Sequence, residues 1–193
     1  MKKPIFLASQ SKQRQKLLKL LGINFKVKPS HIQEERRISA NCSSLVKGNA
    51  LAKARDVAKK LKSGIVIAAD TVVLSGTKKI FGKPKNLTEA KNMLKELSRK
   101  PQWVYTGLAV VDITDKKSYT AYEKTKVFMQ RLSLKEIDRY FSHVWPLDKA
   151  GAFDIQNKGS IFIRRIEGCF YNVVGLPLSR LARILKKVGV DVF

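Results

Sequence analysis

The run Ile65-Val66-Ile67-Ala68-Ala69, between Gly64 and Asp70, constrains the fold of this chain more than any other feature. Every side chain in the run is apolar, so both faces of a strand built from it must be buried. A strand buried on both faces lies inside a sheet that has helices on either side. The run therefore predicts an α/β protein, and it places Asp70 where the central strand ends.

Helical and strand patterns alternate on both sides of this run. Leucines at helical spacing end at Gly22, and apolar residues recur every three or four positions from Ser43 or Ser44 to about Leu61, which predicts two helices. No repeat or linker divides the chain, so we expect one continuous domain over residues 1–193. The other predicted elements are strands over 5–8, 104–111, 119–129 and 161–166, and helices over 87–97, 133–141 and 178–188.

The charge of the chain restricts its partners without choosing among them. There are 39 Lys and Arg residues against 15 Asp and Glu residues, a net charge of +24, which attracts nucleic acid, membrane surfaces or phosphorylated substrates. The basic residues are scattered, no nucleic-acid-binding motif occurs, and Trp103 and Trp145 are interpreted as packing residues. We therefore expect no nucleic-acid partner, although a basic nucleic-acid-binding protein is the main alternative from another class.

The sequence contains no pattern typical of export or membrane insertion. No apolar stretch approaches the roughly 20 residues that cross a bilayer, and the apolar run near the N-terminus is too short for a signal peptide. Cys42 and Cys169 lack metal-type spacing and allow at most one disulfide. We expect a cytoplasmic protein that has no membrane partner.

The segment from Ser9 to Arg14 joins the first predicted strand to the first helix. It supplies hydroxyls, backbone amides and cations at a helix N-terminus, an arrangement that attracts phosphate. The alternative is that Ser9 or Ser11 merely caps the helix while Lys12 and Arg14 face solvent.

Asp70 is the second candidate, because a carboxylate after a buried strand is costly unless it is paired, protonated or bound to a cation. Glu34 and Glu35 are the nearest upstream acids, and a second carboxylate would complete an oxygen site for Mg²⁺. A capping or salt-bridging role is the alternative for Asp70. Lys53 and Lys47 lie at similar angles on their helix, so periodicity does not choose a cationic partner.

Two loops complete the set of candidates. Gly82-Lys83-Pro84 is a stiff turn that would hold one lysine in a limited orientation. The segment from Pro146 to Gln156 is dense in small, charged and amide residues, which would suit contact with a nucleobase or a ribose. The alternative is an ordinary surface loop.

Taken together in chain order, the candidate segments resemble those of the Maf family of nucleotide pyrophosphatases, also called septum formation inhibitor proteins. The resemblance implies an elongated mixed sheet flanked by helices, with two lobes around a central cleft as in inosine triphosphatase-like proteins, and a possible homodimer. The segments that carry it are Leu7 to Arg14, Gln33-Glu34, Lys53-Ala54, Ala69-Asp70-Thr71, Gly82-Lys83-Pro84, Thr106-Gly107, Pro146 to Gln156 and Asn172 to Pro177.

The resemblance also implies a reaction, the hydrolysis of a nucleoside triphosphate to the monophosphate and pyrophosphate. Asp70 would accept a proton from water, and Glu34 and Asp70 would hold Mg²⁺ or Mn²⁺. The residues that would grip the triphosphate are Ser9, Arg14, Lys53 and Lys83.

Within the family, Thr71 and Gln156 resemble the subgroup that acts on dTTP, UTP and modified pyrimidine nucleotides. The family also contains a 7-methyl-GTP subgroup, which is the alternative. Lys12 stands where a proline is usual, and Gln13 stands where the pyrimidine subgroup often has arginine, a position linked to base choice. The resemblance implies a house-cleaning role. The family's older name suggests a third interpretation, a regulator of cell division that acts through a partner.

Overall fold

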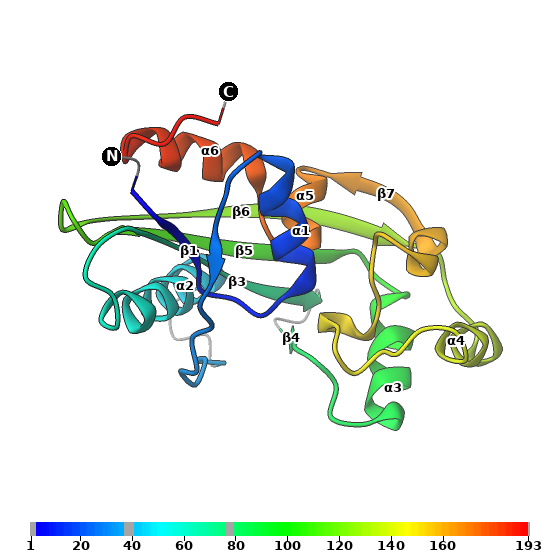
Figure 1. Ribbon diagram of the computed structural model, residues 1–193. Helices are drawn as coiled ribbons and strands as arrows, with labels where there is room; N and C mark the ends of the chain where they lie inside the picture. Colours follow the sequence, from blue (N-terminus) through cyan, green and yellow to red (C-terminus); the bar gives the residue numbers. More distant parts are fainter. Residues whose placement is uncertain (1–2, 37–40, 76–78, 193) are drawn as a thin grey trace. The chain divides into compact units, whose positions relative to one another are not determined.

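The computed structural model describes residues 3–36, 41–75 and 79–192 of the chain (Figure 1). The chain divides into two compact units. Unit 1 comprises Met1–Thr71, Thr106–Glu123 and Gly175–Phe193, and unit 2 comprises Val72–Tyr105 and Lys124–Val174. Each unit is therefore assembled from segments that are distant in the sequence.

Within the described residues, seven strands form one mixed sheet in the order β2-β1-β3-β5-β6-β7, and β4 pairs with β3. β1 is parallel to β2 and to β3, whereas β4 is antiparallel to β3 and β7 is antiparallel to β6. The expected mixed α/β sheet is confirmed. The strands are β1 (Ile5–Leu7), β2 (Lys26–Val27), β3 (Ile65–Ser75), β4 (Ile80–Phe81), β5 (Gln102–Asp112), β6 (Lys117–Met129) and β7 (Ile163–Glu167).

The long helices lie where periodicity predicts them. Short elements such as β2, β4 and α5 are not anticipated, because they span too few residues to show a period. The strand predicted over residues 161–166 begins instead at Ile163, since Lys158–Phe162 forms a 3-10 helix. The helices are α1 (Lys12–Leu20), α2 (Cys42–Ala58), α3 (Leu87–Leu97), α4 (Leu134–Phe141), α5 (Phe170–Val174) and α6 (Leu178–Lys187).

One prediction about the central strand is wrong. β3 does not end at Asp70 but continues to Ser75, so the carboxylate lies inside the strand. The residues after Asp70 explain the extension, because Thr71, Val72 and Val73 are β-branched and favour strand geometry. A buried carboxylate is tolerated in mid-strand here because it is paired.

The core of unit 1 has α2 on one face of the sheet and α6 on the other (Figure 1). Side chains alternate along β3, so Val66 and Ala68 pack with Ala50 and Ala54 of α2. Gly107 of β5 permits this close approach, since a Cβ at that position would lie 2.1 Å from the carbonyl oxygen of Val46. The sheet therefore lies directly against the helix that carries the candidate cation.

Unit 2 has its own apolar core. Leu94 of α3, Ile137 of α4 and Val127 of β6 are fully buried in it, and Tyr140 packs edge-on against Phe162 with ring centroids 5.0 Å apart. α3 and α4 therefore both cover the sheet face that Val127 occupies.

Candidate active site

Asp70 and Thr71 occupy a special part of β3. The pairing of β1 with β3 reaches Leu7 opposite Ile67, and the pairing of β4 with β3 is in place at Val73 opposite Phe81. Asp70 and Thr71 lie between these two paired stretches. Because successive side chains of a strand point to opposite faces, the side chains of Asp70 and Thr71 lie on opposite faces of the sheet.

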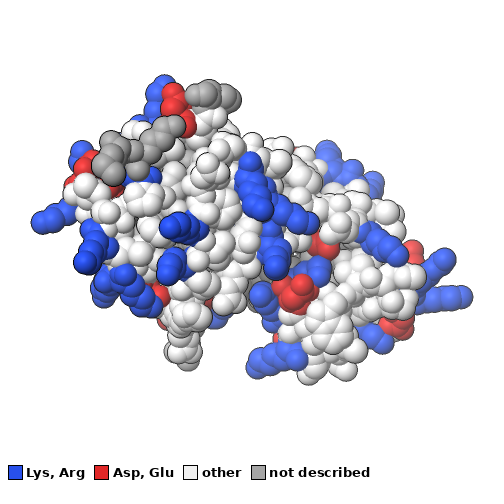
Figure 2. Space-filling view, in the orientation of Figure 1, with Lys and Arg blue, Asp and Glu red and all other residues white. Residues whose placement is uncertain are grey.

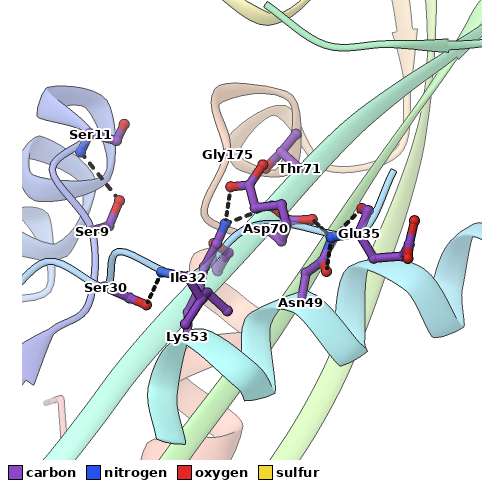
Figure 3. Close-up of polar contacts among 12 residues, drawn as sticks. Ser9, Ser11, Ser30, Ile32, Glu35, Asn49, Lys53, Asp70, Thr71 and Gly175 are labelled. Carbon is purple, nitrogen blue, oxygen red and sulfur yellow. Dashed lines mark hydrogen bonds and ion pairs between the residues drawn. The ribbon is translucent and has the colours of Figure 1, made fainter. Parts of the chain in front are cut away.

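Asp70 faces α2 and is held there by two side chains (Figure 3). Lys53 Nζ donates to one carboxylate oxygen at 2.7 Å, and Asn49 Nδ2 donates to the other at 2.8 Å. Asn49 and Lys53 are four residues apart on the same helix face, which is why both reach one carboxylate. Asp70 is 2% exposed and Lys53 is 8% exposed, so the contact is buried.

Lys53 also joins Glu34 to this group, because its Nζ lies 2.5 Å from Glu34 Oε1. The alternative cation, Lys47, lies instead over the ring of Tyr122. The structure therefore brings together Glu34, Lys53 and Asp70, three residues that the family resemblance assigns to the site, and it distinguishes two lysines that periodicity leaves equivalent.

Asn49 is a site residue that sequence reasoning missed. Its side-chain amide exchanges two hydrogen bonds with the backbone of Glu35, of 2.9 and 3.0 Å, in addition to its bond to Asp70 (Figure 3). The loop that carries Glu34 is thereby fixed to α2 and β3 together. A polar residue among the apolar positions of a helix face was the available signal.

The environment of Asp70 keeps it ionised. Burial on its own raises the pKa of this carboxyl, but the charge and hydrogen bond of Lys53 and the hydrogen bond from Asn49 outweigh it. The pKa of Asp70 therefore lies below its ordinary value. Asp70 is an anion at neutral pH, suited to binding a cation and to orienting water.

Thr71 faces the other side of β3 and meets Arg14 of α1. The Arg14 guanidinium donates to Thr71 Oγ1 at 3.0 Å and to the Gly175 carbonyl at 3.0 Å, and more weakly to Ser9 Oγ at 3.4 Å. Thr71 Oγ1 also lies 2.9 Å from Thr106 Oγ1, a second contact that the sequence did not reveal. These partners fix the guanidinium in one orientation.

Arg14 is electrostatically linked to the carboxylates on the opposite face. Burial lowers the pKa of its guanidinium, while the negative charges of Asp70 and Glu34 act in the other direction. Arg14 remains charged, since guanidinium groups in proteins do not lose their proton near neutral pH.

The turn before α1 contains both a helix cap and an inward-facing cation, the two features that the sequence offered as alternatives. Ser11 caps the helix by accepting from the Arg14 amide at 3.4 Å, and Ser9 accepts from the Ser11 amide at 3.2 Å. Capping by Ser11 does not leave Arg14 facing solvent, because the Arg14 side chain points inward. Lys12 is exposed and Gln13 is half-buried. The segment thus offers one fixed cation beside buried Ser9.

The oxygens of Glu34 and Asp70 suit a hard cation. Both carboxylates contact the same ammonium group, so their oxygens converge on one region. Over the described ranges 3–36, 41–75 and 79–192, no group of three or more His, Cys, Asp or Glu residues is placed to hold a metal. Two carboxylates fit Mg²⁺, which proteins often bind through one or two carboxylates together with substrate phosphates and water.

Lys83 and Gln156 belong to unit 2, whereas the polar side chains around Asp70 and Arg14 belong to unit 1. Both side chains are exposed. The loop that carries Lys83 is fixed within unit 2, because the Gly82 carbonyl accepts from the Gly151 amide at 3.0 Å and Pro84 is buried. Their predicted roles toward substrate stay predictions.

Known proteins of similar sequence establish the family. A family model described as Maf-like protein matches residues 4–188. The chain belongs to the Maf family. Its relatives include proteins named dTTP/UTP pyrophosphatase from Bacillus cereus, 46% identical over 98% of this chain and 92% of the relative, and from Methanosarcina barkeri, 46% identical over 98% of this chain and 96% of the relative.

Solved structures of Ham1 proteins share the fold of this Maf protein. A HAM1 protein from Coxiella burnetii has a TM-score of 0.56 at 17% identity, and covers 97% of this chain and all of its own. The Staphylococcus aureus Ham1 protein has a TM-score of 0.51 at 16% identity over 96% of this chain and 100% of its own. None of the described helices of the Maf protein has the length and apolar character of a membrane span.

Proposed function

We propose that this Maf protein is a metal-dependent pyrophosphatase that hydrolyses dTTP and UTP to the nucleoside monophosphate and pyrophosphate. The observation that carries the proposal is the buried carboxylate of Asp70, held as an anion by Lys53 and Asn49 beside Glu34. The names of relatives at 46% identity support both the reaction and the substrates.

The cations of the site have distinct tasks in this proposal. Hydrolysis between the α and β phosphates builds negative charge on phosphate oxygens, which fixed donors stabilise. Arg14 is oriented by Thr71 and Gly175, so its remaining N–H groups and Ser9 can bind a phosphate without reorganising. Lys53 and Lys83 provide further positive charge toward the triphosphate.

Glu34 and Asp70 would hold the Mg²⁺ or Mn²⁺ ion. When bound, such a metal lowers the pKa of water and offsets phosphate charge. Displacing the Lys53 ammonium from between the two carboxylates would free it to contact the phosphates. Asp70, as an anion throughout the neutral range, is available to orient the attacking water and accept its proton.

Base choice is assigned to Thr71, Gln13 and Gln156. Support for a pyrimidine comes from the relatives' names and from the resemblance of Thr71 and Gln156 to the dTTP/UTP subgroup. Lys12 and Gln13 depart from that subgroup's pattern, so this is where a preference for 7-methyl-GTP would arise.

The setting of the enzyme is also proposed. The family resemblance supports a cytoplasmic homodimer with a house-cleaning role and a link to cell division, and it gives no reason for a membrane partner. Light scattering of the purified chain measures the oligomeric state directly.

A nucleotide panel tests the proposal. Pyrophosphate and orthophosphate release are measured for dTTP, UTP, CTP, GTP, ATP and 7-methyl-GTP, with Mg²⁺, with Mn²⁺ and with EDTA. We expect metal-dependent pyrophosphate release from dTTP and UTP, and a loss of at least about 10³-fold in Asp70→Asn. Preference for 7-methyl-GTP would overturn the base assignment, and orthophosphate release would overturn the proposed bond cleavage.

A further inference from the structure

Basic side chains outnumber acidic ones over the visible surface of the Maf protein (Figure 2). With a net charge of +24, a basic surface alone does not mark a site. Pairing is more informative, because a cation that contacts a carboxylate has part of its charge cancelled. A concave region whose cations lack such partners is a better candidate for binding an anion.

Unit 2 contains such a region, a cavity of about 490 Å³. Its lining includes five cationic side chains and no acidic one, and the ring of Phe128 contributes an apolar wall. The cations come from the loop after α3, the segment that follows β6 and the start of β7, and they are Arg99, Lys100, Arg131, Arg164 and Arg165.

Most of these cations have no carboxylate partner among the described residues. In the part of the chain that the structure describes, no ion pair involves the side chain of Arg99, Lys100, Arg131 or Arg164. Arg165 pairs with Glu167 at 2.8 Å, and both of these side chains are exposed. The like charges around the cavity repel one another, so a polyanion bound there would relieve that repulsion.

A ladder of cations and aromatic rings continues from the cavity along the sheet. Phe128 and Arg165 are paired across β6 and β7, and the guanidinium lies 4.3 Å from the ring centroid. Lys126 lies 5.0 Å from the Phe128 centroid and 5.3 Å from that of Trp103, and Lys124 lies 3.8 Å from the Trp103 centroid. Alternation places Lys124, Lys126 and Phe128 on one face of β6.

We propose that this surface binds single-stranded nucleic acid. The basic track comprises the five cavity cations together with Trp103, Lys124, Lys126 and Phe128. Cations contact backbone phosphates and aromatic rings stack on bases in proteins that bind single strands. The β6 part of the track extends about 13 Å at roughly 3.3 Å per residue, which suits a chain of phosphates better than one compact phosphate group.

The inference goes beyond pyrophosphatase activity and departs from the expectation drawn from the sequence. That expectation rested on scattered basic residues, but the fold gathers positions between 99 and 165 onto one surface of unit 2. The interpretation of Trp145 as a packing residue is wrong, since it is 62% exposed. Trp103 is half-buried and contacts Lys124, so its ring forms part of the basic track.

Fluorescence anisotropy of a labelled 12-nucleotide oligo(dT), in EDTA to prevent turnover, tests the proposal. Replacing Arg99, Arg131 and Arg164 together with Gln should weaken binding at least tenfold. It should also lower the slope of log K against log salt by about 2, at roughly 0.7 per phosphate contact. A matched control replaces three other exposed cations of unit 2, Lys135, Arg139 and Lys158, with Gln and should change binding less than threefold.

Tryptophan fluorescence provides a second readout. Trp145→Phe leaves Trp103 as the sole tryptophan, because the chain contains two, and oligo(dT) should quench it. Equal weakening in the two triple variants, absence of binding, or an unquenched Trp103 would overturn the proposal. Displacement of the oligonucleotide by inorganic triphosphate at equal phosphate concentration would overturn it in favour of a compact anion site. These binding measurements are independent of dTTP turnover.

Discussion

The candidate active site and the basic track both gather cations, but their cations have different partners. Lys53 is buried and contacts the carboxylates of Glu34 and Asp70. Arg131 and Arg164 are exposed, and no ion pair of the described residues includes them. Pairing fixes a side chain and offsets its charge, whereas an unpaired cation keeps its charge available for a ligand. The positions of the few acidic residues therefore distinguish the two regions better than net charge does.

The largest effect on stability should come from Lys53→Met. Removing one partner of a buried ion pair leaves an uncompensated charge, which costs about 3–5 kcal/mol of unfolding free energy. Urea denaturation measures the loss. Lys47→Met is the matched control on the same helix, and we expect it to cost less than about 1 kcal/mol because the Lys47 ammonium lies over the Tyr122 ring. Similar losses of unfolding free energy in both variants would contradict the distinction between the paired Lys53 and Lys47.

Asn49→Ala should have the next largest effect. The change removes a hydrogen bond from the buried carboxylate of Asp70, which costs about 1–3 kcal/mol, and two hydrogen bonds that fix the backbone of Glu35. Because the lost hydrogen bond lowers the pKa of Asp70, the acid limb of the kcat/KM profile should move to higher pH. Asn49→Gln, which keeps the amide, serves as the comparison. An unmoved acid limb would mean that Asn49 does not position Asp70.

The pH dependence of stability should show a smaller effect of Asp70. Its pKa is lowered by folding, so its contribution is present above the unfolded pKa of about 3.9 and is lost as pH falls through the folded value. The difference in unfolding free energy between wild type and Asp70→Asn should therefore shrink as the pH falls below about 4. Guanidinium denaturation at several pH values measures it, and a constant difference would contradict the assignment.

The smallest effect on stability is expected in the basic track. Exposed substitutions away from special features usually change the unfolding free energy by less than about 0.5 kcal/mol each. The Gln variant of Arg99, Arg131 and Arg164 should thus unfold within about 1.5 kcal/mol of wild type, and repulsion relief would make it more stable. A larger loss would show that these residues have structural partners.

The sequence was sufficient to predict the long elements and most of one cluster. The apolar run before Asp70 predicted the central strand, and burial of the carboxylate limited Asp70 to pairing, protonation or a bound cation. The sequence did not choose between Lys53 and Lys47, because helical angle alone does not tell which residue lies opposite Asp70. The register between α2 and β3 decides this, and the close approach at Gly107 helps to set it.

Other contacts depend on segments that are distant in the sequence. Arg14 reaches Gly175 across the fold of unit 1, and the cavity of unit 2 unites Arg99 with Arg164. No local period reports such encounters. The end of β3 was mispredicted for a related reason, since a charge normally interrupts an apolar strand and only tertiary pairing allows the strand to continue.

The most direct test of the account measures dTTP turnover in three proteins: wild type, Asp70→Asn, and the Gln variant of Arg99, Arg131 and Arg164. Pyrophosphate release is recorded at saturating Mg²⁺, with circular dichroism to verify folding. The account predicts that Asp70→Asn loses at least about 10³-fold in rate, as expected for removal of a catalytic group, while the arginine variant stays within twofold of wild type. A folded Asp70→Asn that retains turnover, or an arginine variant that loses it, would contradict the assignment of catalysis to the paired cluster.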